Sequence, residues 1–444
     1  MLVLACKNGI LTKEKRVMSP STLATAIDLT DMDMFATREP YELYDELRAH
    51  SPIWRHPETP SHEEPFWLVT SHDLITRAHR MGPVLSHQTG PGRNGTGGIT
   101  IADVETGPGI MMIMTDPPDH TRYRKLVSRG FTPRMVSKLE DWLRTRSHHI
   151  IDSLDGRTEG DFVIDLASEL PLMVIAEIVG VPQEDRDQLF EWTNSAIGRH
   201  DPEFQDHDDP YAPNNAPMDA FNMTMYAQQL VEEKRRCPRD DLMTKLAHAK
   251  VTMGDGSVTE LNDLELSLFF TLLVVAGNET TRNAITHGVL AFDKYPDQWE
   301  LLRRHPELMP SAVDEILRYS SPVRYFRRTA TEDLELGGAH IAAGEKVALW
   351  YTAGNRDPEV FDDPHRFDIT RTPNPHIAFG GGGAHYCLGA NLAKLELEVF
   401  FEALINRLPE IEVVGTPVRL RDLQVHGIKH LPVRYGPVAD AAAA

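Results

Sequence analysis

Hydrophobic positions along the chain repeat mainly with a helical period. The most apolar stretch spans residues 261–290, and its apolar side chains lie all round the predicted helix, which indicates a buried central helix. Alternating, strand-like stretches are short and lie at residues 66–70, 334–336 and 346–350. The pattern predicts a mainly α-helical fold with small β-sheets. We expect a single domain over residues 31–436, with tails at 1–30 and 437–444.

Two stretches interrupt the helical pattern. Residues 90–109 contain seven glycines and lead into the apolar run 110–114, and residues 201–217 contain four prolines with many Asp and Asn. Both stretches are long for loops inside a domain, and such loops are often lids or binding loops. A disordered insertion is the alternative interpretation.

Composition and charge exclude several classes of function. The chain has 444 residues and a formal net charge of -21, so the phosphate backbone of a nucleic acid is an unfavourable partner. Its three cysteines, Cys6, Cys237 and Cys387, provide no disulfide framework, which favours a reducing cytoplasm. The longest apolar run has 12 residues, whereas a membrane span needs roughly 20, so we expect no membrane anchor.

The strongest chemical candidate is Cys387. It follows a glycine-rich turn in the segment Phe-Gly-Gly-Gly-Gly-Ala-His-Tyr-Cys-Leu-Gly (residues 379–389), and apolar positions with helical spacing begin at Leu388. A thiol at a helix N-terminus has a lowered pKa, because free N–H groups and the helix dipole stabilise the thiolate. The glycines allow the backbone to pass close to a flat, bulky group.

Two simpler interpretations of this loop are available. A lone cysteine is usually a small core residue. A glycine loop before a helix can also hold a phosphate, but no Lys-Ser or Lys-Thr follows here, and His385 and Tyr386 occupy positions that a dinucleotide fingerprint reserves for glycine.

The segment resembles the haem loop of the cytochrome P450 family, in which a Phe precedes the cysteine that binds the iron. Phe379 lies eight residues before Cys387, whereas the usual spacing is seven, so this loop has one extra glycine. A similar loop occurs in the bacterial lineage that oxidises steroids and methyl-branched lipids. The resemblance implies haem b as the cofactor, with Cys387 as the metal ligand and Phe379, Gly381 and His385 as haem contacts.

A second motif lies in the middle of the predicted central helix. Ala276-Gly277-Asn278-Glu279-Thr280-Thr281 combines a glycine, which costs about 1 kcal/mol relative to alanine in a helix, with an acid and an alcohol. A partly exposed helix end is the alternative. By its resemblance to the family's A/G-G-x-D/E-T motif, the segment assigns proton delivery to Glu279 and Thr280, since O–O cleavage requires two protons.

Further motifs follow in the family's order. Glu315 and Arg318 have the spacing of a helical ion pair, and the resemblance makes them a structural triad with Arg366. Asp116 is a candidate cap, with Pro117 in the first turn, for a helix that places His120 and Arg124 on one face. The resemblance implies that His120, Arg124 and Arg328 bind the haem propionates. Arg122, Lys125 and Arg129 lie on the opposite face, either as a docking patch for an acidic ferredoxin or as a solvated surface.

The resemblance covers residues 31–435 and implies hydroxylation of an unactivated C–H bond with O₂ and two electrons from a ferredoxin and its NAD(P)H-dependent reductase. A haem-based sensor and a peroxide-driven peroxygenase are the alternatives. Lineage-like segments favour the terminal methyl of a branched lipid, isoprenoid or steroid side chain, with terpenoid hydroxylation second. We expect an apolar pocket, whose predicted lining is Ile110, Met112, Met114, Val275, Ala276, Val323, Phe326 and Ile428.

Overall fold

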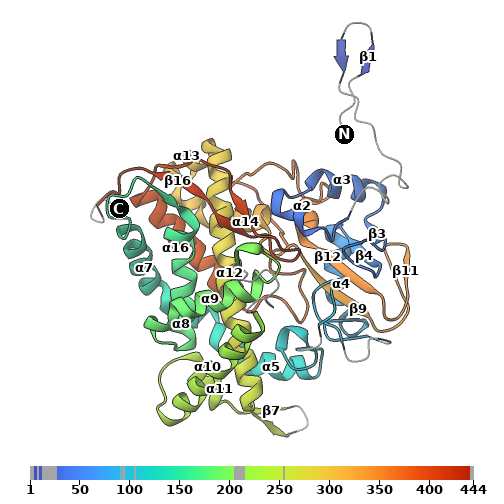
Figure 1. Cartoon of the computed structure of the whole chain (residues 1–444), viewed down its shortest axis with the longest axis vertical. Coiled ribbons are helices and arrows are strands. Elements are labelled where there is room, and N and C mark those ends of the chain that lie inside the picture. The colour runs from blue at the N-terminus through green and yellow to red at the C-terminus, as the bar shows by residue number, and fades with distance from the viewer. Residues whose placement is uncertain are drawn as a thin grey trace.

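The longest helix, α12 (Asp263–Lys294), runs through the middle of the helical part of the protein (Figure 1). The computed structural model of the protein describes residues 5–7, 10–12, 28–90, 92, 96–104, 107–204, 216–253 and 256–440. The helix begins with a capping box, in which Asn262 Oδ1 accepts from the Glu265 N–H and Glu265 Oε2 accepts from the Asn262 N–H, both at 2.9 Å. The helix predicted over 261–290 is confirmed.

Most other helices pack around α12 and share one large apolar core with it. The α-helices in chain order are α2 (Met32–Thr37), α3 (Tyr41–His50), α4 (His72–Arg80), α5 (Asp119–Val127), α6 (Pro133–Val136), α7 (Glu140–Asp152), α8 (Glu169–Val179), α9 (Arg186–Ile197), α10 (Ala216–Arg236), α11 (Leu242–Ala247), α13 (Pro296–Arg304), α14 (Met309–Ser320), α15 (Tyr351–Gly354) and α16 (Ala390–Arg407). Short 3₁₀ turns include η2 (Met112–Met114) and η7 (Pro202–Phe204), and Val163–Ala167 forms a π-helical turn, η5. Among the described residues, no helix combines the length and apolar character needed to cross a bilayer.

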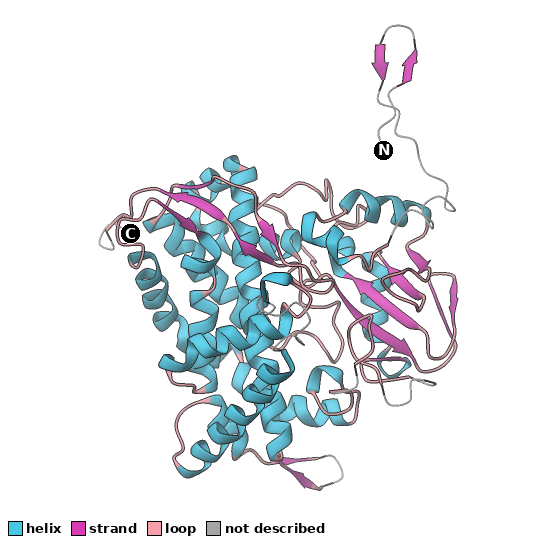
Figure 2. Ribbon diagram, in the orientation of Figure 1, coloured by secondary structure: helices cyan, strands magenta, loops and turns pink. Residues whose placement is uncertain are grey.

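The main β-sheet lies beside the helical part (Figure 2). Its strands run in the order β3 (Ile53–His56), β4 (Phe66–Val69), β12 (Lys346–Trp350), β9 (Tyr325–Ala330) and β5 (Leu85–Ser86), and only β12 and β4 pair in parallel. Smaller sheets are formed by β13 (Ile411–Val413), β16 (Pro432–Tyr435) and β6 (Glu159–Asp161), and by the pairs β1 (Ala5–Lys7) with β2 (Ile10–Thr12), β7 (Val251–Thr252) with β8 (Val258–Thr259), β10 (Leu334–Leu336) with β11 (Ala339–Ile341), and β14 (Val418–Arg419) with β15 (Ile428–His430). The three predicted strands correspond to β4, β10 and β12.

The buried ion pair on α14 differs from the prediction in its third member. Glu315 and Arg318 form the expected pair, with Arg318 Nη2 and Nε donating to the two carboxylate oxygens at 2.7 Å each. The side chain of Arg366 is 52% exposed and points toward Asp297, and only its carbonyl oxygen contacts Arg318, at 2.9 Å. Arg371 donates to Glu315 instead, at 3.2 Å. Arg371 therefore supplies the guanidinium that was predicted from Arg366.

The start of α5 also differs from the prediction. The helix begins at Asp119 after the Pro117-Pro118 pair, and Asp116 does not cap it with its side chain. The Asp116 carboxylate accepts instead from the Ser86 hydroxyl and, at 2.9 Å, from the His87 N–H. Asp116 thus joins the end of β5 to the start of α5, because partners distant in the chain compete for the carboxylate that a local cap would use.

Candidate active site

A cavity lies between α12 and the loop that precedes α16. It encloses about 1450 Å³ of space, part of it open to solvent, and its walls are mainly apolar. Cys387 and Phe379 form part of the lining contributed by this loop, and Ala276, Gly277 and Thr280 form part of the lining contributed by α12. The structure therefore brings the two motifs singled out in the sequence to one cavity.

The loop before α16 passes so close to α4 that two of its positions have room only for glycine. The Cys387 N–H donates to the Phe379 carbonyl at 3.0 Å, which closes the loop around the extra residue. Gly383 has φ +78° and a Cβ there would lie 2.3 Å from the His79 carbonyl oxygen on α4, while one on Gly381 would lie 2.8 Å from Thr76 Cα. Gly381 does not line the cavity. The close approach explained by Gly381 and Gly383 is thus to α4 and not directly to a flat group in the cavity.

The environment of Cys387 acts on its pKa in two directions. The residue has exposed surface, but this surface faces the cavity, and protein atoms surround the thiol closely. Burial raises the pKa of Cys387, while the N–H of Gly389, the charge of Arg124 and the N–H of Ala390 lower it. The sequence predicted only the lowering effect of the helix N-terminus. Burial has the larger effect on the pKa of Cys387 in the protein alone, and a cation bound at the sulfur would favour the thiolate.

On α12, the hydroxyl and the acid of the second motif face different surroundings. Thr280 lines the cavity, and its hydroxyl donates to the Ala276 carbonyl at 2.8 Å, which leaves its oxygen able to accept a hydrogen bond. Glu279 is buried and does not line the cavity. Its carboxylate pairs with Arg282 and accepts from Asn283 Nδ2 at 3.1 Å. Proton delivery by Glu279 therefore requires the carboxylate to leave Arg282.

One rim of the cavity concentrates basic side chains. His120, Arg124, Arg328 and His385, all proposed from the sequence, line it together with His79 and His87, which the sequence analysis missed. Burial lowers the pKa of His120 to about 4, with a further contribution from the charge of Arg124. Burial likewise lowers the pKa of His385, followed by the charges of His120 and Arg328. The charges of Arg124 and Arg328 give this rim a positive potential, which suits an anion.

These features fit an iron porphyrin. The guanidinium nitrogen Nη2 of Arg328 and Nε2 of His385 are buried and have no hydrogen-bond partner among the described residues, and both groups face the cavity. Unpaired buried donors of this kind need an acceptor. A haem provides two carboxylates for the rim, a flat apolar ring for the walls and an iron for the Cys387 sulfur.

The predicted substrate contacts divide into two groups. Met112, Ala276, Val323 and Phe326 line the cavity. The other four do not line it. Val275 packs against the helical core, and Met114 packs beside Gly98 and Gly107. Ile428 is buried and its N–H donates to Asn283 Oδ1 at 2.9 Å, whereas Ile110 is 39% exposed.

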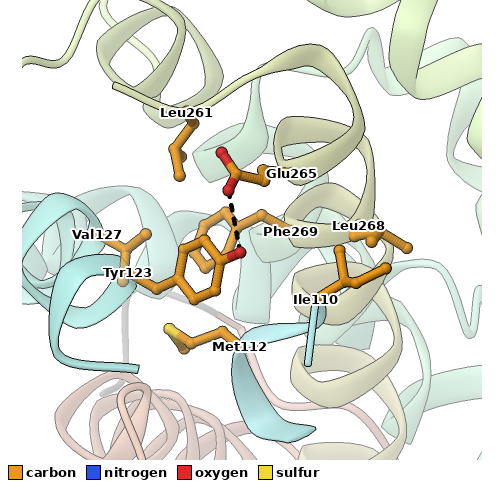
Figure 3. A pocket seen from close by; sticks show the side chains of 8 residues that line it. All are labelled: Ile110, Met112, Tyr123, Val127, Leu261, Glu265, Leu268 and Phe269. Carbon is orange, nitrogen blue, oxygen red and sulfur yellow. Dashed lines mark hydrogen bonds between the residues drawn. The ribbon is translucent and has the colours of Figure 1, made fainter. Parts of the chain in front are cut away.

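Figure 3 shows where Ile110 points. It faces a small second pocket between η2, α5 and the start of α12, which is also lined by Leu261, Leu268 and Tyr123, with the Tyr123 hydroxyl donating to Glu265 at 3.0 Å. Met112 lines this pocket as well as the large cavity, so its side chain separates the two spaces. Ile110 lies in the turn that precedes η2, and its side chain lines this second pocket and not the large cavity.

Several lining residues were not predicted. Leu273 and Ala284 share helical spacing with Ala276, Gly277 and Thr280, so the periodicity of α12 could have identified them. Further missed lining residues are Ile113, Leu272, Leu317 and Glu396. Burial raises the pKa of Glu396 to about 8, and its Oε2 has no hydrogen-bond partner within the described part of the chain. No motif marks this acid in the sequence.

The basic face of α5 is partly occupied by internal contacts. Arg122 pairs with Glu265 at 2.6 Å and donates to Thr259 at 2.6 Å, so it is committed to α12 and the adjoining hairpin. Lys125 is exposed, and the side chain of Arg129 lies outside the described residues. Of the three predicted docking residues, Lys125 alone is shown to be exposed.

Comparisons with known proteins agree with this geometry. A family model for cytochrome P450 matches residues 97–414. The steroid C26-monooxygenase of Rhodococcus jostii is 43% identical over 430 residues, covering 96% of this chain and 88% of that protein. The methyl-branched lipid omega-hydroxylase of Mycobacterium tuberculosis is 39% identical, covering 96% and 99%. A Mycobacterium marinum cytochrome P450 solved in complex with pseudoionone is 35% identical with a TM-score of 0.81, covering 92% and 98%.

Proposed function

This chain belongs to the cytochrome P450 family and is a haem-dependent monooxygenase, and from that premise we propose that it hydroxylates a terminal methyl group on the side chain of a steroid or on a methyl-branched lipid. The observation that carries the proposal is the apolar cavity that places Cys387 and Thr280 in one space. The names of the two relatives indicate the substrate class. We propose haem b as the form of the cofactor.

The side chains that would hold the haem are Cys387 for the iron and Arg124, Arg328, His120 and His385 for the carboxylates. Bound haem iron supplies the activation of O₂ with two electrons. Thr280 would accept a hydrogen bond in the cavity and so hold a proton donor close to the oxygen. Glu279 would act one step further back, after rotation away from Arg282.

The apolar walls select the substrate and exclude water. Met112, Val323, Phe326 and Ala276 present hydrocarbon surface to the cavity. Burial of each CH₂ group is worth about 0.8 kcal/mol, or about a fourfold gain in affinity. A branched aliphatic chain with a methyl end is therefore a better occupant than a small polar molecule.

The test is a binding and product screen with four ligands: a steroid with a branched side chain, a steroid without one, a methyl-branched fatty acid and a straight-chain fatty acid. Displacement of the iron-bound water, read in the absorption spectrum, should require the lowest concentrations of the two branched ligands. Mass spectrometry should place the new hydroxyl on a terminal methyl. Hydroxylation of the steroid ring, or tighter binding of the steroid without a side chain, would contradict the proposal.

A second candidate is hydroxylation of a terpenoid. It is favoured by the likeness to the structure solved with pseudoionone, which is an isoprenoid ketone. Pseudoionone added to the same screen decides between the candidates: faster turnover of pseudoionone than of both branched ligands would favour the terpenoid.

For electron supply we propose an acidic ferredoxin with an NAD(P)H-dependent reductase, docking near Lys125. A Lys125→Glu variant should slow reduction by the ferredoxin and weaken the salt dependence of the rate. Arg304→Glu, on α13 at the far end of the molecule in Figure 1, is the control. Equal slowing by both variants would contradict docking near α5. We further propose that residues 31–436 act as one domain in the cytoplasm.

A further inference from the structure

His87 lies on the basic rim of the cavity, directly after β5, and no motif in the sequence marks it. Its ring stacks on that of His385, with ring centroids 3.3 Å apart and planes inclined by 11°. His385 stacks in turn on His120, with centroids 3.8 Å apart. Three imidazoles from three separate segments are thus brought face to face: one after β5, one on α5 and one in the loop of Cys387.

Asp116 joins two of these segments by hydrogen bonds. Its Oδ1 accepts from the His87 N–H at 2.9 Å, its Oδ2 accepts from the Ser86 hydroxyl, and its carbonyl oxygen accepts from the His120 N–H at 2.9 Å. One residue therefore fixes where His87 and His120 stand relative to each other. A carboxylate held by two donors, on a residue whose backbone carbonyl accepts from a third, is a rigid anchor.

The orientation of the His87 ring leaves one nitrogen for a ligand. Nδ1 lies 3.3 Å from the Ile113 carbonyl oxygen, which can only accept, so Nδ1 donates there. Nε2 is then the nitrogen that remains for a group in the cavity, and it can donate to that group only when the ring carries both protons.

The surroundings of His87 call for an anion. Burial, followed by the charge of Arg328, keeps the pKa of His87 well below its usual range. Neither Arg124 nor Arg328 forms an ion pair within the described residues. Arg328 is buried, and the only carboxylate whose charge acts on it among the described residues is that of Asp116. A further carboxylate placed beside it lowers the cost of burying its charge and favours the protonated imidazole.

We propose that His87 is a third imidazole that donates a hydrogen bond to a carboxylate of the haem, and that Asp116 is the residue that positions it. This inference rests on the haem cofactor of the proposed function, and it is independent of the substrate. It adds one donor to the set that the sequence motifs contain.

The test measures the rate of haem transfer from the holoenzyme to an excess of apomyoglobin. His87→Phe keeps an aromatic ring for the stack but has no donor, and a hydrogen bond to a charged group is worth about 1.5–3 kcal/mol, so transfer should become about 10- to 100-fold faster. His87→Gln keeps an N–H donor and should restore a rate near that of the wild type. The exposed His340→Phe serves as the control variant.

Asp116 is tested by coupling. Asp116→Ala should also speed haem transfer, and the double variant with His87→Phe should be no faster than the faster single variant, because both remove the same interaction. An unchanged rate in His87→Phe, or a fast rate in both His87→Phe and His87→Gln, would overturn the donor role of His87. Additive effects in the double variant would overturn the positioning role of Asp116. A wild-type protein that binds no haem would instead overturn the cofactor assignment, and this inference with it.

Discussion

Two buried clusters of arginine and acceptor groups differ in how their charge is balanced. Around α14, the Glu315 carboxylate accepts from Arg318, Arg371, Asn374 and the Asp368 N–H. Arg318 Nη1 also donates to the carbonyls of Asn355 and Pro364, and Arg318 Nη2 also donates to that of Arg366. At the cavity rim, Arg328 donates to the Arg327 carbonyl and leaves Nη2 without a partner among the described residues. In the first cluster Glu315 and Arg318 are paired with each other, and in the second a buried guanidinium donor remains for a ligand.

The difference separates a structural cluster from a binding site with the same kinds of side chains. A buried charge that is fully paired contributes to the fold and resists removal. A buried charge with unpaired donors lowers the stability of the ligand-free protein, and binding of a ligand restores that stability. Mutations in the first cluster should therefore lower the stability of the fold, and mutations in the second should weaken binding of the ligand.

The largest effect is expected from Arg318→Met. Removing one partner leaves the Glu315 carboxylate buried without its main counter-ion, which typically costs about 3–5 kcal/mol. Chemical denaturation followed by circular dichroism measures the loss. Arg366→Met is the matched control, because the Arg366 side chain is largely outside the cluster, and it should change the free energy of unfolding by about 0.5 kcal/mol or less. An equal loss in both variants would show that Arg366 belongs to the cluster after all.

The opposite pattern is expected from Arg328→Met at the rim. Haem transfer to apomyoglobin should become about 10- to 100-fold faster, because a charge-assisted hydrogen bond to a carboxylate is lost. The thermal midpoint measured in excess haem should stay close to that of the wild type, since no ion pair within the described residues is broken. A large fall in that midpoint with unchanged haem transfer would show that Arg328 stabilises the fold and does not bind the haem.

A third cluster, nearer the surface, should give the smallest effect. His430 contacts Asp161 at 2.5 Å and Glu203 at 2.6 Å, and although burial alone lowers its pKa, these two carboxylates raise it above the usual 6.5. A raised pKa in the folded state means that the stabilisation is fully present below pH 6.5 and is lost as the pH rises through the folded value. The difference in free energy of unfolding between wild type and His430→Ala should therefore shrink with rising pH. A difference that grows with pH would contradict the assignment.

The sequence predicted those parts of the fold and site that are encoded locally. The central helix and the strands follow from periodicity, and the lining positions of Cys387, Thr280, His120 and Arg328 follow from short motifs that resemble those of the family. The residues it missed owe their places to partners far along the chain. Arg371 lies 56 positions from Glu315, and Asp116 lies 29 positions from His87, so no local pattern reports either contact.

The predicted pocket shows the same limit at shorter range. Ala276 and Val275 are neighbours, yet only Ala276 lines the cavity, because α12 turns Val275 into the core. Met112 lines both the large cavity and the second pocket, whereas Ile110 lines the second pocket (Figure 3) and not the large cavity. In an α-helical or 3₁₀ turn, adjacent side chains point in directions that differ by about 100–120°. Tertiary packing decides which of them faces the cavity, and the sequence pattern does not show that packing.

The absorption spectrum of the dithionite-reduced protein with CO shows directly whether the Cys387 sulfur binds the iron. The wild type should show the long-wavelength band typical of thiolate-bound haem. Cys6→Ser and Cys237→Ser should keep this band, and Cys387→Ser should lose it while haem remains held by the basic rim. Persistence of the band in Cys387→Ser would contradict the account.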